Sequence, residues 1–261
     1  WGGRSYLSSL EGFLPCKKKN VCYNSDIGYY NYKESEVKKF TGFTLAEVLI
    51  TLGIIGVVAA LTLPSVINNY RKQELITRLK KSYTVINQSI KLAEVDNGEF
   101  ENWYSVDELG RTEYVNRYIK KYFNILKECD TYQSCGYPRA NYKALNGSTY
   151  RYGTVWKDNG ITFAVSDGSI YQFRTRVQTE DAGNEGVYGA LVFVDINGSK
   201  EPNMLGKDVF MFKRQNAVIR PFGSELSYNE IDANCKKDKT GEYCAAKIMA
   251  DGWVLKDDYP W

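Results

Sequence analysis

One continuous apolar segment constrains this chain more than any other feature. Residues 43–63 read FTLAEVLITLGIIGVVAALTL, and Glu47 is the only charged residue in this segment. As a helix rising ~1.5 Å per residue, the segment is ~30 Å long, which is the thickness of a bilayer's hydrocarbon core. The chain as a whole is polar, with a mean hydropathy of −0.43, and no later segment resembles a second span. We therefore expect one membrane-spanning helix.

The residues around the start of this segment form a specific pattern. Lys38 and Lys39 precede Gly42, and Phe43-Thr44-Leu45-Ala46-Glu47 follows it directly. A secretory signal peptide would carry its cleavage site after the apolar run instead. The pattern resembles the class III leader of type IV prepilins and type II secretion pseudopilins, and the resemblance extends to about Asn97.

The resemblance implies a processing and assembly route. A prepilin peptidase would cut between Gly42 and Phe43 and methylate the new amine of Phe43. Glu47 would then be the fifth residue of the mature chain and pair with the N-terminal ammonium of an adjacent subunit. A carboxylate costs up to ~2.5–3.5 kcal/mol at the centre of a membrane helix, so such a residue is usually kept for a partner. The alternative is that Glu47 lies close enough to the helix end to reach the interface.

The same resemblance implies where the protein acts and with what. The partners would be other pilin or pseudopilin subunits and an inner-membrane assembly platform. The chain would cross the inner membrane once, with its head outside the cytoplasm, and would enter a periplasmic or extracellular filament. No cofactor is expected to be required.

The apolar pattern continues beyond the span as one long helix. Pro64 is expected to kink this helix rather than end it, because an amphipathic stripe follows. Asp96-Asn97-Gly98 is a plausible stop, with Gly98 supplying a left-handed cap. The stripe consists of Val66, Ile67, Tyr70, Leu75, Leu79, Tyr83, Ile86, Ile90 and Ala93.

The globular head combines a shorter helical pattern with several strands. Residues 105–123 have helical periodicity, and Gly110 divides them. Asp167-Gly168 is a tight-turn signal between two of the strand-like runs. We expect an α+β fold in which the long helix packs on an antiparallel sheet, the pilin-like arrangement that the leader implies. The expected strands are 150–156, 161–165, 170–174, 190–194, 209–213 and 217–220.

The expected organisation therefore has four parts. Residues 1–42 are a leader or upstream segment, 43–64 the membrane and filament-core helix, 65–97 its amphipathic half, and 98–261 the head. A leader of 42 residues is long for this family. We expect Val37 to be the true start, read from a GTG codon, with residues 1–36 a translated upstream region; the alternative is a genuine long leader.

Composition excludes several classes of function. The sequence has no His and a formal net charge of only +3. A Ser-His-Asp or Cys-His catalytic site cannot be built without His, and so small a charge argues against a protein that mainly binds nucleic acid. Nothing else in the sequence resembles a catalytic motif, so we do not expect an enzyme.

The mature part contains four cysteines, Cys129, Cys135, Cys235 and Cys244. In an exported domain they are expected to form two disulfides, most simply within each local pair. Three connectivities exist, and the sequence does not choose among them; a site in which four thiolates hold a metal is the alternative.

One loop of the head is rich in oxygen-bearing side chains. Residues 195–208 include Asp195, Asn197 and Asp208, and Ca²⁺ is held by six to eight oxygens from carboxylates and carbonyls. The spacing is not that of an EF-hand. Major pseudopilins carry calcium in a loop between late strands, and this loop is similar in composition, so the resemblance makes these three residues candidate ligands of a structural Ca²⁺. The alternative is a turn fixed by its own side chains.

Two observations leave the function open at this stage. A single-span, membrane-anchored periplasmic binding domain that never polymerises would share the apolar helix. The basic residues that follow the span outnumber Lys38 and Lys39, which by the positive-inside rule favours a cytoplasmic head. The leader pattern and the cysteines favour the opposite orientation.

Overall fold

The structure is a computed structural model. It describes residues 16–18, 21–24, 28–31, 42–104, 106–154, 160–174, 191–216 and 218–261. The earliest described elements are three short strands, β1 (Cys16–Lys18), β2 (Val21–Asn24) and β3 (Gly28–Asn31), which form an antiparallel sheet in that order.

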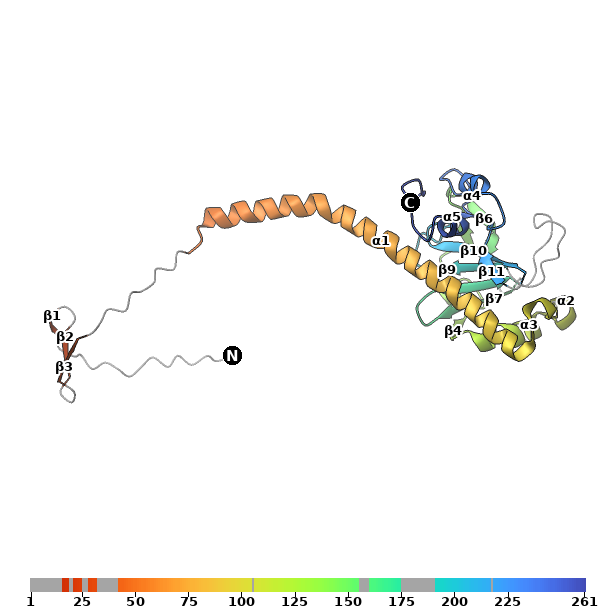
Figure 1. Cartoon of the computed structure of the whole chain (residues 1–261), viewed down its shortest axis with the longest axis horizontal. Coiled ribbons are helices and arrows are strands. Elements are labelled where there is room, and N and C mark those ends of the chain that lie inside the picture. The colour runs from red at the N-terminus through yellow and green to blue at the C-terminus, as the bar shows by residue number, and fades with distance from the viewer. Residues whose placement is uncertain are drawn as a thin grey trace. The chain divides into compact units, whose positions relative to one another are not determined.

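A single helix, α1 (Leu45–Asn97), follows as the longest element (Figure 1). Pro64 lies inside it, and the helix continues, as predicted. Gly98 ends the helix with φ +82°, and its N–H donates to the Glu94 carbonyl at 2.9 Å. Glycine adopts this left-handed conformation without the steric penalty that a Cβ would impose.

The head is built around a six-stranded antiparallel sheet with the order β11-β10-β9-β8-β7-β4. A second sheet pairs β5 with β6. The strand bounds are β4 (Ile125–Glu128), β5 (Asn141–Lys143), β6 (Thr149–Thr154), β7 (Gly160–Val165), β8 (Ile170–Arg174), β9 (Leu191–Asp195), β10 (Val209–Gln215) and β11 (Val218–Pro221).

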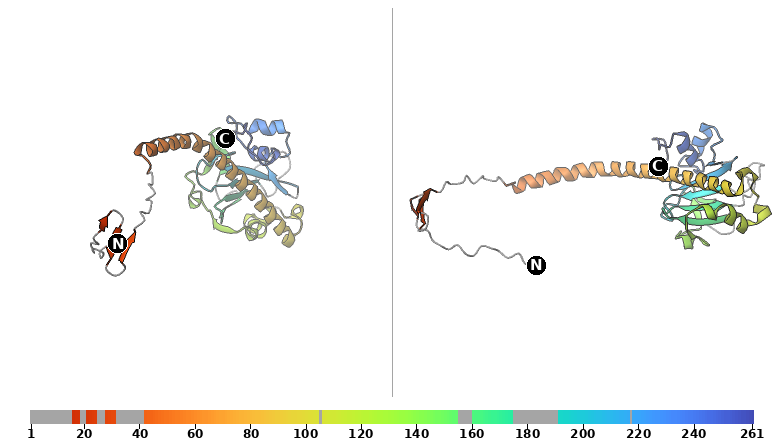
Figure 2. Two further views of the ribbon diagram at one scale, coloured as in Figure 1. Left: turned by 60° about the vertical axis from the view of Figure 1, so that its left-hand side comes forward. Right: turned by 60° about the horizontal axis from the view of Figure 1, so that its bottom comes forward.

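The second half of α1 packs along one face of the large sheet (Figures 1 and 2). Successive side chains of a strand point to opposite faces. In β9, Val192 and Val194 therefore join the core that contains Leu79, while Leu191 and Phe193 join a second core on the other face. Because both faces are covered, β9 is buried along its whole length.

Short helices surround the sheet. Gly110, with φ +75°, separates α2 (Val106–Leu109) from α3 (Arg111–Tyr118), which is the predicted division. α4 (Tyr228–Asn234) and α5 (Cys244–Ala250) lie near the C-terminus. The described residues also contain three single-turn 3₁₀ helices: Phe100–Asn102, Lys120–Tyr122 and Gln133–Cys135.

The α+β, pilin-like fold is confirmed. Each expected strand corresponds to an observed one, with ends that differ by two residues at most; residues 155, 156, 190 and 217 of the expected strands lie outside the described residues. The sequence analysis missed β4, β5, α4 and α5. The Asp167-Gly168 turn joins β7 to β8, with Gly168 at φ +86°.

Candidate functional site

The start of α1 carries the residues of the leader pattern. Gly42, Phe43 and Thr44 precede the helix, and the Phe43 side chain is 89% exposed. Thr44 and Glu47 form a capping box: Thr44 N–H donates to Glu47 Oε2 at 2.8 Å, and Glu47 N–H donates to Thr44 Oγ1 at 3.2 Å. The Thr44 hydroxyl also donates to Glu47 Oε2, at 2.7 Å.

This capping box gives the Glu47 carboxylate partners within its own chain. The reciprocal bonds satisfy N–H groups that a helix start leaves unpaired. Sequence reasoning placed Glu47 but overlooked Thr44, although Thr-x-x-Glu before an apolar run is the signature of such a box.

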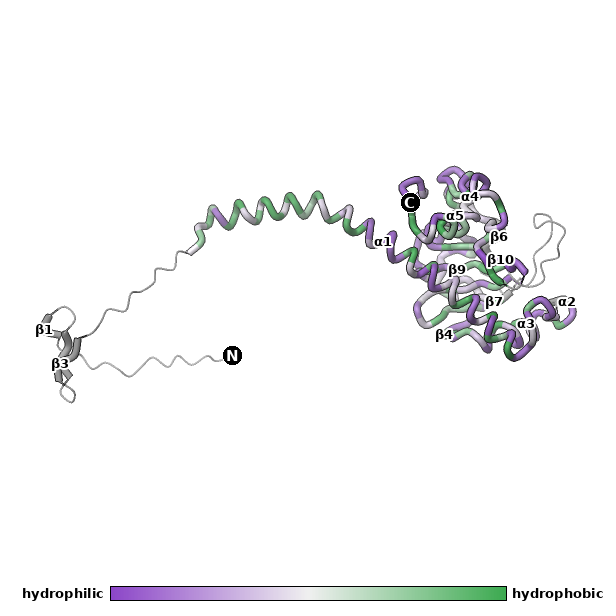
Figure 3. Tube along the Cα trace, viewed as in Figure 1, coloured by the Kyte–Doolittle hydropathy of each residue, from purple (hydrophilic) through white to green (hydrophobic). Residues whose placement is uncertain are grey.

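Apart from Glu47, the part of α1 that extends as far as Ile67 is predominantly apolar (Figure 3). Its large side chains are exposed, and none of its most apolar 18-residue window is buried. It belongs to the one helix in the described part of the chain that is long and apolar enough to cross a membrane. An exposed apolar helix of this length is explained by a surrounding bilayer or by contact with similar helices.

The loop between β9 and β10 buries two carboxylates. Asp195 is fully buried, and Tyr137 Oη donates to its Oδ2 at 2.8 Å. Asp208 is 3% exposed, and its two oxygens accept from the N–H groups of Met204 and Asn203 at 2.6 and 2.9 Å. Asp208 thus holds the loop backbone, and Asp195 Oδ1 also accepts from the N–H of Asn197 at 3.2 Å.

Oxygen atoms converge on Asp195. One terminal atom of the Asn197 amide lies 2.8 Å from Asp195 Oδ1, 3.0 Å from the Gly198 carbonyl and 3.3 Å from the Lys200 carbonyl. The corresponding atom of Asn203 lies 3.1 Å from Asp195 Oδ2 and 3.2 Å from the Lys200 carbonyl. These five residues, Asp195, Asn197, Gly198, Lys200 and Asn203, are called the oxygen cluster below.

Rotating either amide by 180° resolves these contacts, because its NH2 group then donates to the same oxygens. The opposite terminal atoms of Asn197 and Asn203 lie 3.4 Å from Asp208 Oδ2 and from the Ser199 carbonyl, which also only accept. An amide has one donating end and one accepting end. With the nitrogens toward Asp195 the loop therefore satisfies itself, whereas amide oxygens turned toward Asp195 would need a cation between them.

Burial opposes charge on both carboxylates. Burial raises the pKa of Asp195 well above its ordinary value, and the neighbouring Asp208 carboxylate adds to this rise. Burial raises the pKa of Asp208 to about 6, against the N–H donors of Met204 and Asn203, which lower it. A cation in the oxygen cluster would reverse this preference, because it favours the ionised form.

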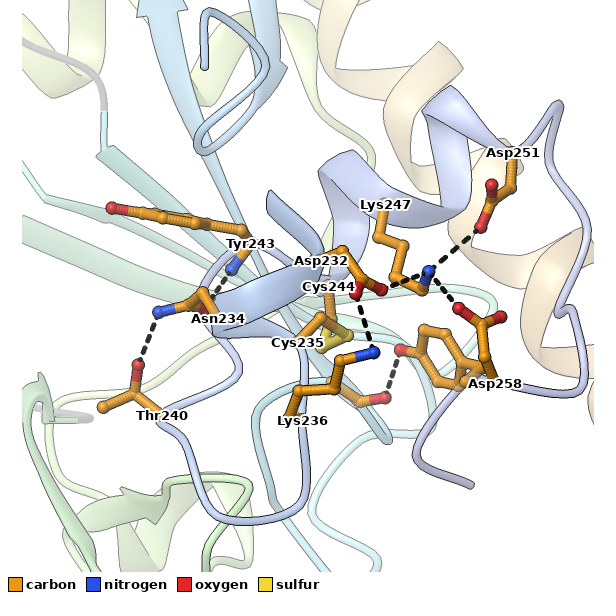
Figure 4. Close-up of a disulfide and its surroundings, with 12 residues drawn as sticks. Asp232, Asn234, Cys235, Lys236, Thr240, Tyr243, Cys244, Lys247, Asp251 and Asp258 are labelled. Atoms are coloured by element: carbon orange, nitrogen blue, oxygen red, sulfur yellow. Dashed lines mark hydrogen bonds and ion pairs between the residues drawn. A yellow bond between two sulfur atoms is a disulfide. The ribbon is translucent and has the colours of Figure 1, made fainter. Parts of the chain in front are cut away.

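The four predicted cysteines pair locally. Cys129 and Cys135 form one disulfide with a Cα–Cα distance of 5.4 Å, and Cys235 and Cys244 form the other with 4.9 Å (Figure 4). The structure thus contains the simplest of the three pairings, and the four thiolates do not form a metal site.

A buried lysine beside the second disulfide was not predicted. Lys247 is fully buried, and its Nζ lies 2.7 Å from carboxylate oxygens of Asp232 and Asp258 and 3.6 Å from Asp251 Oδ2 (Figure 4). Tyr228 Oη completes its contacts at 3.0 Å. These partners come from α4, the end of α5 and the C-terminal tail. No local spacing in the sequence indicates that these acidic side chains and Tyr228 surround a lysine.

Two models of known protein families match the chain. A family described as a family of unknown function (DUF6613) matches residues 65–261, and the prokaryotic N-terminal methylation motif matches residues 37–63. No curated protein matches, and no solved structure matches. The second match ends where the first begins, so the motif and the head are contiguous. The chain therefore belongs to the DUF6613 family and is a type IV pilin-like protein.

Proposed function

We propose that this chain is the structural subunit of a type IV pilus-like filament, most simply a type II secretion pseudopilus or a type IV pilus. A prepilin peptidase cleaves it after Gly42 and methylates Phe43. Before assembly, the mature chain is anchored in the inner membrane with its head outside the cytoplasm. An assembly platform then adds it to the filament, and Glu47 pairs with the terminal ammonium of a neighbouring subunit.

The observation that carries this proposal is the methylation motif placed directly on an exposed apolar helix whose early carboxylate is Glu47. An anchored binding domain has no need for an acidic residue in its span, since such a residue opposes insertion. A filament subunit gains from it, because opposite charges in an apolar core neutralise each other.

The test combines processing with assembly. Intact mass and N-terminal sequencing of the protein from a host with its own prepilin peptidase should give a chain that begins at Phe43 with one extra methyl group. Glu47→Ala should abolish filaments and leave the melting temperature of the head unchanged, while Glu113→Ala, at an exposed position of α3, should assemble normally. A chain that retains Lys38 and Lys39, or a Glu47→Ala variant that assembles, favours the anchored binding domain.

A structural calcium ion in the oxygen cluster is the second part of the proposal. Asp195, Asn197 and Asn203 would supply side-chain oxygens, and Gly198 and Lys200 backbone carbonyls. No group of three acidic, His or Cys side chains suitable for a metal occurs in the described residues. A set dominated by amide and carbonyl oxygens suits Ca²⁺ rather than a softer metal. The ion would link the two ends of the loop and neutralise Asp195.

Terbium offers a direct test of this ion. The Tyr137 hydroxyl lies 2.8 Å from Asp195, so excitation of tyrosine should sensitise luminescence of Tb³⁺ bound in the cluster. Asp195→Asn should abolish this signal and make the melting temperature insensitive to EGTA, whereas Asn146→Ala, in an exposed turn, should change neither. The calcium site would be wrong if the wild-type protein gave no Tb³⁺ luminescence and melted at the same temperature in Ca²⁺ and in EGTA. The loop would then be a turn held by its own hydrogen bonds.

A further inference from the structure

Between the apolar part of α1 and the head lies a stretch of helix that packs on neither. Val66 and Ile67 are the last exposed aliphatic residues of the apolar part, and Leu75 is the first α1 residue buried in the head. Tyr70, in between, is 66% exposed. This stretch spans roughly 12 Å at 1.5 Å per residue, about twice the thickness of one polar headgroup layer.

Two basic residues of this stretch, Arg71 and Lys72, differ from most of the other cations of α1. Arg78 pairs with Glu74 at 3.0 Å, Lys81 with Asp167 at 2.6 Å and Lys91 with Glu94 at 2.7 Å. Arg71 and Lys72 form no ion pair within the described ranges, and Lys80 is the remaining α1 cation of that kind. The unpaired cations closest to the span are therefore Arg71 and Lys72.

Helix geometry directs these side chains toward the membrane. Side chains of an α-helix tilt toward its N-terminus, which here is the end of the apolar segment. Arg71 and Lys72 lie roughly 6–8 Å beyond Ile67 along the axis. Long basic side chains at this depth place their charged ends among headgroups, and tyrosine is enriched at the same level.

We propose that Tyr70, Arg71 and Lys72 bind anionic phospholipid headgroups on the head side of the bilayer. This inference rests on the proposed membrane anchoring, and it adds a lipid class and the residues that select it. The phosphate groups supply the counter-charges that Arg71 and Lys72 lack in the part of the chain that the structure describes. The contact fixes the depth of the subunit and holds the base of the head at the surface until assembly withdraws it.

The test measures lipid selectivity in bilayers. Full-length protein is reconstituted into phosphatidylcholine vesicles, and spin-labelled phosphatidylglycerol and phosphatidylcholine report their relative association with the protein. One basic residue near a surface favours anionic lipid by about fivefold. Arg71→Gln/Lys72→Gln should therefore reduce the preference for phosphatidylglycerol by at least fivefold at low salt. The control Lys80→Gln/Lys237→Gln removes the same charge farther from the bilayer and should retain the preference.

The outcomes separate this inference from the proposal on which it rests. An unchanged preference in Arg71→Gln/Lys72→Gln overturns the inference, and so does an equal loss in the control, because net charge alone then explains the selectivity. If Arg71→Gln/Lys72→Gln keeps its lipid preference but loses filaments, the two cations serve a neighbouring subunit instead. Flotation of the vesicles tests anchoring separately: wild-type protein that does not float overturns both proposals.

Discussion

Asn87 joins α1 to the edge strand β11 through both ends of its amide. Its Nδ2 donates to the Ile219 carbonyl at 3.0 Å, and its Oδ1 accepts from the Ile219 N–H at 3.0 Å. Asn87→Ala leaves both groups of the buried Ile219 without these partners and should lower the free energy of unfolding by about 1–3 kcal/mol. Urea denaturation measures the loss. The neighbouring exposed residue gives the control, Gln88→Ala, and equal losses for the two variants would contradict the assigned bonds.

The ion pairs of Lys247 should make the stability of the head depend on pH. The side chains of Lys236 and Lys247 lower the pKa of Asp232. Burial raises the pKa of Asp251, but Lys256, Tyr228 and Lys247 lower it below its ordinary value. For Lys247 itself, burial lowers the pKa, and its hydrogen bonds to Asp232 and Asp258 raise it by more, so the ammonium stays charged.

These pKa shifts determine how the stability of the head changes with pH. Lowered carboxylate pKa values stabilise the fold above about pH 4, and this contribution disappears as the pH falls through the folded-state values. The raised pKa of Lys247 contributes below about pH 10, as long as the carboxylates that raise it remain ionised. Lys247→Met should therefore cost about 3 kcal/mol at pH 7 and clearly less at pH 3. Lys236→Met, which removes an exposed partner of Asp232, should cost less than about 1 kcal/mol. Denaturation at both pH values checks this, and a pH-independent cost would contradict it.

At the scale of one element, the buried and exposed faces of α1 should contribute differently to the stability of the head. Leu79 is fully buried against the sheet, while Leu92 on the same helix is 57% exposed. Leu79→Ala should lower the free energy of unfolding by about 3 kcal/mol, because it removes buried methyl groups and leaves a cavity. Leu92→Ala should change it by less than about 0.5 kcal/mol. Thermal or urea unfolding distinguishes them, and similar costs would mean that this half of α1 does not pack as described.

The elements also show what periodicity can predict. α1 and β7 to β10 have strong helical or strand-like patterns because they form the core, and the sequence predicted them. β4 was missed because it is an edge strand whose residues are mostly exposed, with Leu126 at 74%. α4 is a single short helix, yet its Ser227 and Glu230 form a capping box that the sequence displays.

The candidate sites were predictable to different degrees. Gly42, Phe43 and Glu47 lie in a contiguous motif that is readable from sequence, and their roles in processing and assembly stay predictions. Asp195 and Asn197 were selected by composition, and the structure brings Asn203 beside them. The contacts of Lys247 depend on how α4, α5 and the tail meet, which no pattern within one segment encodes.

For the whole molecule, the basic residues after the span and the disulfides of the head favour opposite orientations in the membrane. Arg71, Lys72 and three later basic residues follow the span, which by the positive-inside rule favours a cytoplasmic head. The two disulfides of the head instead belong to an oxidising compartment. Long domains cross membranes largely regardless of their charge, so these basic residues do not prevent export of the head.

We therefore predict that the head lies outside the cytoplasm, in the orientation that its disulfides require. In spheroplasts, added protease should digest the head while a cytoplasmic marker stays intact. On a gel, the protein should migrate faster without reductant than with it, because Cys235–Cys244 and Cys129–Cys135 keep the denatured chain compact. The variant with all four of these cysteines replaced by serine should lose this difference. A protected head with reduced cysteines would mean that the basic residues after the span determine the orientation, and export through the pilin route would then be wrong.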